Sequence, residues 1–178
     1  MSGIFAKEDL QVEKRAVDRV LSEEEIKMFW LAVDHSRITE KNKIFIKLCL
    51  IYACRNGELR LSEKSHFDFD KKVWTIPPEN HKLGKKSGKP LLRSITPEIE
   101  GYLKQAFEQS PKSKYVFTND GSDEVMGMRA PLALPYNIMQ YLGRHEGYEL
   151  AHFSMHDLRC TAQTNFSTLA EPVYICKR

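Results

Sequence analysis

The chain has 178 residues, 42% of them hydrophobic and 29% charged, with a formal net charge of +3. This composition is typical of one globular domain that can bury a core. No apolar run approaches membrane-spanning length, and the start of the chain lacks the apolar core of a signal peptide. The cysteines form no C-x-x-C pair and no structural zinc spacing, so we expect reduced thiols in a cytoplasmic protein: Cys49, Cys54, Cys160 and Cys176.

The first third of the chain predicts an arm followed by two helices. Residues 1–14 lack clear periodicity and are predicted to be a linker or a disordered arm. Ser22 and Glu25 have the spacing of a capping box, and apolar residues follow at helical spacing over 22–36. Residues 41–54 are apolar nearly all round, which is typical of a buried central helix, and this helix is expected to stop near Asn56-Gly57.

The middle of the chain predicts a small antiparallel sheet with a basic loop. Residues 67–77 and 89–96 are strand-like, with Asp70-Lys71-Lys72 as a turn. From Lys71 to Arg93, seven basic residues and one acidic residue give a charge of +6, so the rest of the chain carries −3. Such a cluster is typical of a nucleic-acid contact, although a solvated lysine-rich loop has the same composition.

The second half of the chain predicts three helices and one strand. The expected segments are residues 96–109 (helix), 115–122 (strand and turn), 134–147 (helix) and 154–166 (helix). Thr96 caps the first of these helices, and Ser154 and Asp157 have the spacing of a capping box for the last one. The expected fold class is therefore α+β, mainly helical, with one small antiparallel sheet.

Four basic side chains are candidates for phosphate chemistry. Arg55 follows the buried helix, where it needs either Glu58 or an external anion as a partner. His156 and Arg159 share one face near a helix N-terminus, where backbone N–H groups and the helix dipole favour an anion. Together with Lys82, these groups suit phosphoryl transfer in which fixed cations stabilise the charge that grows on the phosphate.

Three motifs follow one another along the chain: ACRNGELRLSE (53–63), FDFDKKVWTIPPENHK (67–82) and MHDLRCTAQTNF (155–166). In this order they resemble the catalytic domain of tyrosine recombinases, most of all the integrases of phages and genomic islands. The resemblance implies a catalytic domain over residues 15–178, with Arg55, Lys82, His156 and Arg159 catalytic and Glu58 supporting Arg55. From the basic cluster itself we expect Lys85, Lys86, Lys89 and Arg93 to contact DNA. One of the loop lysines at 85, 86 or 89 could take the place of Lys82.

The resemblance also implies an activity and its partners. It implies site-specific recombination of duplex DNA at attachment sites, which integrates or excises a mobile element through a 3′-phosphotyrosine intermediate, with neither a metal nor a nucleotide cofactor. In the family, a second histidine or tryptophan and the nucleophilic tyrosine follow the H-x-x-R motif, and here both would fall beyond Arg178. We therefore expect that Tyr174 is not the nucleophile and that this chain binds DNA without cleaving it. The intact protein is expected to be a cytoplasmic, bacterial or phage-encoded tetramer on DNA, and this chain a monomer without a membrane partner.

Two other functions fit parts of the sequence. His156-Asp157 is an HD pair, as in metal-dependent phosphohydrolases, and His152 and His156 have the i, i+4 spacing of a metal pair, but no further ligand has a suggestive position. Activity that survives a chelator would exclude this alternative. The other alternative is a DNA-binding remnant without catalysis. His66 and His81 are expected to be surface histidines.

Overall fold

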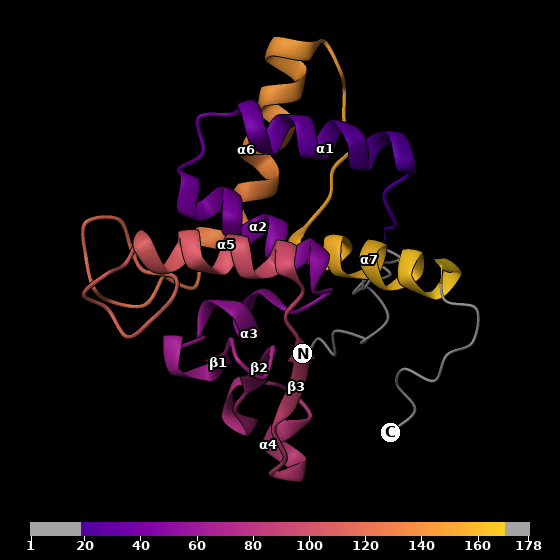
Figure 1. Cartoon of the computed structure of the whole chain (residues 1–178). Coiled ribbons are helices and arrows are strands. Elements are labelled where there is room, and N and C mark those ends of the chain that lie inside the picture. The colour runs from indigo at the N-terminus through magenta and orange to yellow at the C-terminus, as the bar shows by residue number, and fades with distance from the viewer. Residues whose placement is uncertain (1–18, 170–178) are drawn as a thin grey trace, which may run out of the picture.

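The computed structural model describes residues 19–169, with side chains up to residue 165. Its elements are α1 (Glu23–His35), α2 (Glu40–Ile51), α3 (Asn56–Arg60), β1 (Phe67–Asp68), β2 (Val73–Ile76), α4 (Gly84–Ser87), β3 (Leu91–Ser94), α5 (Pro97–Glu108), α6 (Leu134–Tyr141) and α7 (Met155–Leu169). Figure 1 shows α1, α2, α5 and α6 in the upper part of the molecule, the sheet with α3 and α4 below them, and α7 beside them. The expected mainly helical fold with one small antiparallel sheet is confirmed.

The predicted helix starts are confirmed by their hydrogen bonds. The Ser22 hydroxyl accepts from the Glu25 amide at 3.2 Å, and the Glu25 carboxylate accepts in return from the Ser22 amide at 2.9 Å. The Ser154 hydroxyl accepts from the Asp157 amide at 3.3 Å, and the Asp157 carboxylate accepts from the Ser154 amide at 2.8 Å. Each box satisfies amides that the first helical turn leaves without a partner, so these residues fix where α1 and α7 begin.

The predicted end of the buried helix is wrong. Helix α2 stops at Ile51, and Ala53 adopts the left-handed region with φ 49°, which turns the chain before α3 begins. Arg55 is the N-cap residue of α3, and Gly57 lies inside that helix instead of breaking α2. The apolar run did not reveal the helix end because the residues of the turn, including Cys54, stay buried.

The sheet is antiparallel, in the order β1-β2-β3, and it packs against the end of α2. Trp74 on β2 pairs with Arg93 on β3, and its ring lies 4.9 Å from that of Tyr52, the residue after α2. Trp74 is fully buried, so the hairpin and the turn after α2 share one core. The lysine-rich loop between β2 and β3 contains two short helical segments, Pro78–Asn80 and α4.

Two further segments differ from or extend the predictions. Residues 115–122 form no named strand; this segment contributes only isolated bridges from Tyr115 to Glu63 and from Thr118 to Val125. The helix predicted over 134–147 is confirmed as α6, which continues as a π-helical turn over Leu142–Glu146. Within residues 19–169, no helix is long and apolar enough to cross a membrane. The predicted arm over 1–14 lies outside the described residues.

Candidate active site

Arg55 and Glu58 form the first half of the candidate site. Arg55 Nη1 donates to Glu58 Oε1 at 3.0 Å, and the Arg55 amide donates to Glu58 Oε2 at 3.2 Å. The Glu58 side chain is 2% exposed and that of Arg55 40% exposed, so a buried carboxylate holds a guanidinium that still reaches the surface. Arg55 therefore has both a structural partner and a face open to a ligand.

Arg159 supplies the second half, from the far end of the sequence. Its Nε donates to the carbonyl oxygen of Ala53 at 3.1 Å, across 106 residues of sequence. Burial, and after it the nearby charge of Arg55, lower the pKa of the Arg159 guanidinium. This charge effect means that the two guanidinium groups lie within electrostatic range of each other. Because Nε is used by Ala53, the two terminal nitrogens remain for other partners.

His156 lies at the start of α7, one turn before Arg159, and is exposed. Residues three apart on a helix share a face, so the spacing sets its ring on the side of α7 that carries Arg159. The capping box of Ser154 and Asp157 holds this turn, and the Arg19 amide also donates to Asp157 Oδ1 at 3.0 Å. The first turn of α7 is thus fixed at its cap and by the segment that precedes α1.

Lys82 is exposed and lies in the loop between β2 and β3, beside a buried histidine. The expectation of a surface position for His81 is wrong: it is 7% exposed. Its Nδ1 accepts from the Gly84 amide at 3.0 Å, and its Nε2 lies 3.1 Å from the Lys89 carbonyl oxygen. A neutral ring with its proton on Nε2 satisfies both contacts, so His81 ties the two sides of the loop together.

The remaining basic residues of this segment divide into two groups. Lys85, Lys86 and Lys89 are exposed on or next to α4. Arg93 points inward: Nη1 donates to the Tyr52 carbonyl oxygen at 2.6 Å and Nη2 to Glu58 Oε2 at 3.2 Å. The loop therefore offers lysines to solvent, while the arginine at its end joins the cluster of Arg55 and Glu58. The charge pattern alone did not separate these two positions.

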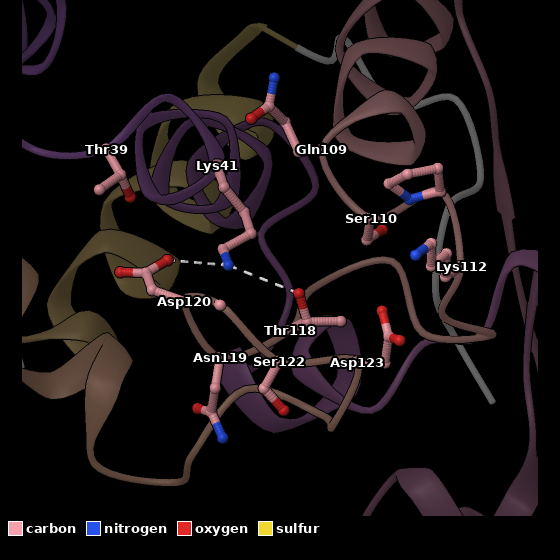
Figure 2. Close-up of a pocket in the computed structure, with 12 residues that line it drawn as sticks. Thr39, Lys41, Gln109, Ser110, Lys112, Thr118, Asn119, Asp120, Ser122 and Asp123 are labelled. Carbon is pink, nitrogen blue, oxygen red and sulfur yellow. Dashed lines mark hydrogen bonds and ion pairs between the residues drawn. The ribbon is translucent and has the colours of Figure 1, made fainter.

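A polar pocket of about 530 Å³ lies elsewhere, between the start of α2 and the segment after α5. Figure 2 shows Lys41 in this pocket, pointing toward Asp120 and Thr118, and its Nζ lies 2.9 Å from Asp120 Oδ1. None of the predicted site residues lines it. Within residues 19–169, no three histidine, cysteine, aspartate or glutamate side chains gather into a group that could hold a metal ion.

The tyrosines of the described part of the chain are mostly engaged in packing. Tyr52 is 6% exposed, and burial raises the pKa of its phenol. Tyr102 and Tyr148 are half-buried against the core, while Tyr136 is 59% exposed on α6. Tyr174 lies outside the described residues. Within residues 19–165, the hydrogen bonds of the Arg55 and Arg159 side chains go to Glu58 and to the Ala53 carbonyl, and not to a tyrosine.

The fold is similar to those of solved DNA recombinases. The Tn1549 transposon integrase in complex with a circular intermediate DNA matches with a TM-score of 0.74 and 14% identity, over 93% of this chain and 58% of that one. XerH recombinase bound to difH substrate matches with a TM-score of 0.65 and 18% identity. This match covers 89% of this chain and 45% of the XerH chain. A lambda integrase dimer bound to a core site matches with a TM-score of 0.63 and 14% identity. This match covers 88% of this chain and 43% of the lambda integrase chain. This chain thus spans little more than half the length of the Tn1549 integrase chain.

The sequence itself decides the family. No curated protein sequence matches the chain. The model of the phage integrase family, however, matches residues 19–169, which is most of the chain and includes all three motifs. The chain belongs to the phage integrase family, the tyrosine recombinases.

Proposed function

We propose that this chain is the catalytic domain of a site-specific DNA recombinase that integrates or excises a mobile element. The observation that carries the proposal is that Arg159 on α7 contacts the turn that leads into Arg55. The two arginines lie 104 positions apart in sequence numbering, yet Arg159 binds the carbonyl of Ala53 in the turn that leads into Arg55. Two guanidinium groups set on one turn suit the non-bridging oxygens of a single phosphate.

In the proposed reaction each basic residue has a separate role. Arg55 and Arg159 bind the non-bridging oxygens and stabilise the charge that develops as a tyrosine oxygen attacks phosphorus. The bond from phosphorus to the 5′ oxygen breaks, and Lys82 gives that oxygen a proton. His156 donates a hydrogen bond to the phosphate or takes the proton of the phenol. The product is a 3′-phosphotyrosine linkage, and no step in this scheme uses a metal ion or nucleotide.

Duplex DNA at the attachment sites is the proposed partner. The exposed Lys85, Lys86 and Lys89 support a contact with the phosphate backbone beside the reacting phosphate. The matched structures of the Tn1549 integrase, XerH and lambda integrase are complexes with DNA. We propose that the whole protein acts as a tetramer on DNA in the cytoplasm of a bacterium, and that this chain alone is a monomer.

The proposal expects the nucleophile to lie outside these 178 residues. In the family pattern the tyrosine follows a second histidine or tryptophan, and we propose that neither of these two positions is among these residues. Arginine clamps without a nucleophile bind a phosphate but form no covalent intermediate. This chain by itself is therefore proposed to bind DNA without cleaving it.

Covalent capture on a nicked attachment-site duplex tests the proposal. Denaturing gels should show no protein–DNA adduct with this chain and an adduct with a version that continues through the tyrosine. In the longer protein, Arg55→Ala and Arg159→Ala should each slow adduct formation about a hundredfold or more. A longer protein that binds the duplex but never forms an adduct would indicate the non-catalytic alternative. An adduct mapped to Tyr174 in this chain would contradict the assignment of the nucleophile.

A further inference from the structure

Arg93 uses its guanidinium inside the protein, although it ends the most basic segment of the chain. On β3, positions alternate between half-buried and exposed, and the Arg93 side chain is 21% exposed. One terminal nitrogen donates to the Tyr52 carbonyl oxygen, the other donates to Glu58, and Nε is buried. In contrast, Lys85, Lys86 and Lys89 of the same segment are exposed to solvent. Position in a basic segment is therefore no sign that Arg93 touches DNA.

Glu58 is shared between two guanidinium groups. Arg55 Nη1 binds Oε1 at 3.0 Å, and Arg93 Nη2 binds Oε2 at 3.2 Å. A carboxylate that is 2% exposed needs compensation by cations, because water does not solvate it. Two cations on one carboxylate leave the cluster with one net positive charge. The more exposed guanidinium is that of Arg55, at 40% against 21%, so the surplus charge faces outward there.

Arg93 also joins the hairpin to the turn that precedes Arg55. Its bond to the Tyr52 carbonyl reaches the end of α2, and the carbonyl of the next residue, Ala53, accepts the bond from Arg159. A strand of the sheet, the turn after α2 and the start of α7 are therefore connected through neighbouring backbone oxygens. The side chain that makes this connection is placed where it can control both the charge and the position of Arg55.

We propose that Arg93 is a positioning residue that compensates Glu58 and thereby leaves the positive charge of Arg55 available to a DNA phosphate. The inference rests on the proposed function, in which Arg55 binds phosphate, and it replaces the direct DNA contact expected for Arg93 from the sequence. Without Arg93, Glu58 and Arg55 become a neutral pair, and the carboxylate holds Arg55 more strongly because no second cation shares it.

A double-mutant cycle on this chain tests the inference, with affinity measured by fluorescence anisotropy on a labelled duplex at several salt concentrations. Arg93→Leu should weaken DNA binding about fivefold to tenfold, close to the effect of Arg55→Leu. In a Glu58→Gln background, the same Arg93→Leu change should alter the affinity by less than about twofold, because no carboxylate remains to neutralise Arg55.

The salt dependence separates positioning from contact. If Arg93 itself bound a phosphate, Arg93→Leu would weaken binding equally in both backgrounds and reduce the salt slope by about 0.9 in the Glu58→Gln background, which would overturn the inference. If Arg93→Leu alone does not fold, Glu58→Gln is compared directly with the double variant, in which no buried carboxylate is left unpaired. Arg55→Leu with unchanged affinity would instead reject the phosphate contact of the proposed function, whatever the Arg93 variants show.

Discussion

The carbonyl oxygen of Ala53 accepts a hydrogen bond from Nε of Arg159 at 3.1 Å, and Ala53 has a positive φ of 49°. The left-handed turn at Ala53 ends α2 and brings Arg55 to the start of α3. One backbone position therefore sets the relation between the two arginines. An alanine with positive φ is strained by a modest free energy, and a β-branched side chain at this position would be strained considerably more.

Substitutions at Ala53 should separate backbone strain from loss of a side chain. We predict that Ala53→Val lowers the free energy of unfolding by about 1–3 kcal/mol, because valine resists positive φ and the site is buried. Ala53→Gly is the matched control and should change it by less than about 1 kcal/mol, since glycine adopts this region freely. Urea unfolding measures both. Equal stability of the valine variant and the parent would show that the turn is not strained.

Binding of the chain to duplex DNA should depend steeply on salt. If about four to six phosphates are neutralised, the logarithm of the binding constant should fall with the logarithm of salt concentration at a slope of roughly −4 to −5. Replacing Lys85, Lys86 and Lys89 together by alanine should flatten that slope, because these exposed side chains are the proposed phosphate contacts. Anisotropy titrations over a range of salt concentrations measure it.

A second triple variant controls for net charge alone. It removes three exposed lysines from other parts of the chain: Lys27, Lys104 and Lys112. Its slope should stay close to that of the parent protein. Equal flattening by both triple variants would show that overall charge, and not the loop between β2 and β3, governs binding.

The sequence predicted the helix starts and the hairpin because their signals are local. Helix starts are marked by three hydroxyl side chains, each of which accepts a hydrogen bond from the amide three residues later: Ser22, Thr96 and Ser154. The end of α2 gave no such signal, since Ala53 is an ordinary residue for a helix and its positive φ depends on packing around it. Local pattern therefore located where helices begin better than where this one ends.

The sequence proposed the members of the candidate site and one contact between them, but not the contacts of Arg93 and His81. The motifs named Arg55, Glu58 and Arg159, and the bond between Arg55 and Glu58 follows from their spacing. The inward direction of Arg93 could not be read from the sequence, because β3 exposes Leu92 and half-buries the arginine beside it, the reverse of the usual preference. The burial of His81 likewise depends on contacts with Gly84 and Lys89, which only the folded loop brings together.

Gly84 should be required for the shape of the lysine-rich loop. A Cβ at this position would lie 2.4 Å from both His81 Nε2 and the Pro78 carbonyl oxygen, and the backbone oxygen cannot move aside easily. We predict that Gly84→Ala breaks the His81 contacts and increases hydrogen exchange across residues 78–90, with weaker DNA binding as a result. Exchange measured by mass spectrometry checks this.

Gly101→Ala is the matched control for that experiment. Gly101 lies in α5, has nothing within 4 Å of an added Cβ, and is exposed. Alanine there should stabilise the protein by up to about 1 kcal/mol through helix propensity and leave the loop unchanged. Unaltered exchange in the Gly84→Ala variant would contradict the anchoring role of His81.

Asp157 should make the stability of the domain depend on pH in the acid range. Partial burial is the largest single influence and raises its pKa, but hydrogen bonds from the Ser154 hydroxyl and amide and from the Arg19 amide more than offset this, so the pKa is lowered. A carboxyl whose pKa is lower in the folded state stabilises the fold above its unfolded pKa of about 4, and this contribution disappears as the pH falls through the folded pKa. We predict that Asp157→Asn costs about 1 kcal/mol at pH 7, the usual loss for a helix cap, and that variant and parent converge as the pH falls through the lowered pKa of Asp157. Urea unfolding at a series of pH values measures the difference in the free energy of unfolding. Ser154→Ala should also lower the free energy of unfolding at pH 7, because it removes one of the hydrogen bonds that lower the pKa of Asp157. A difference that does not shrink as the pH falls through the acid range would show that the charge of Asp157 does not hold the first turn of α7, which carries His156 and Arg159.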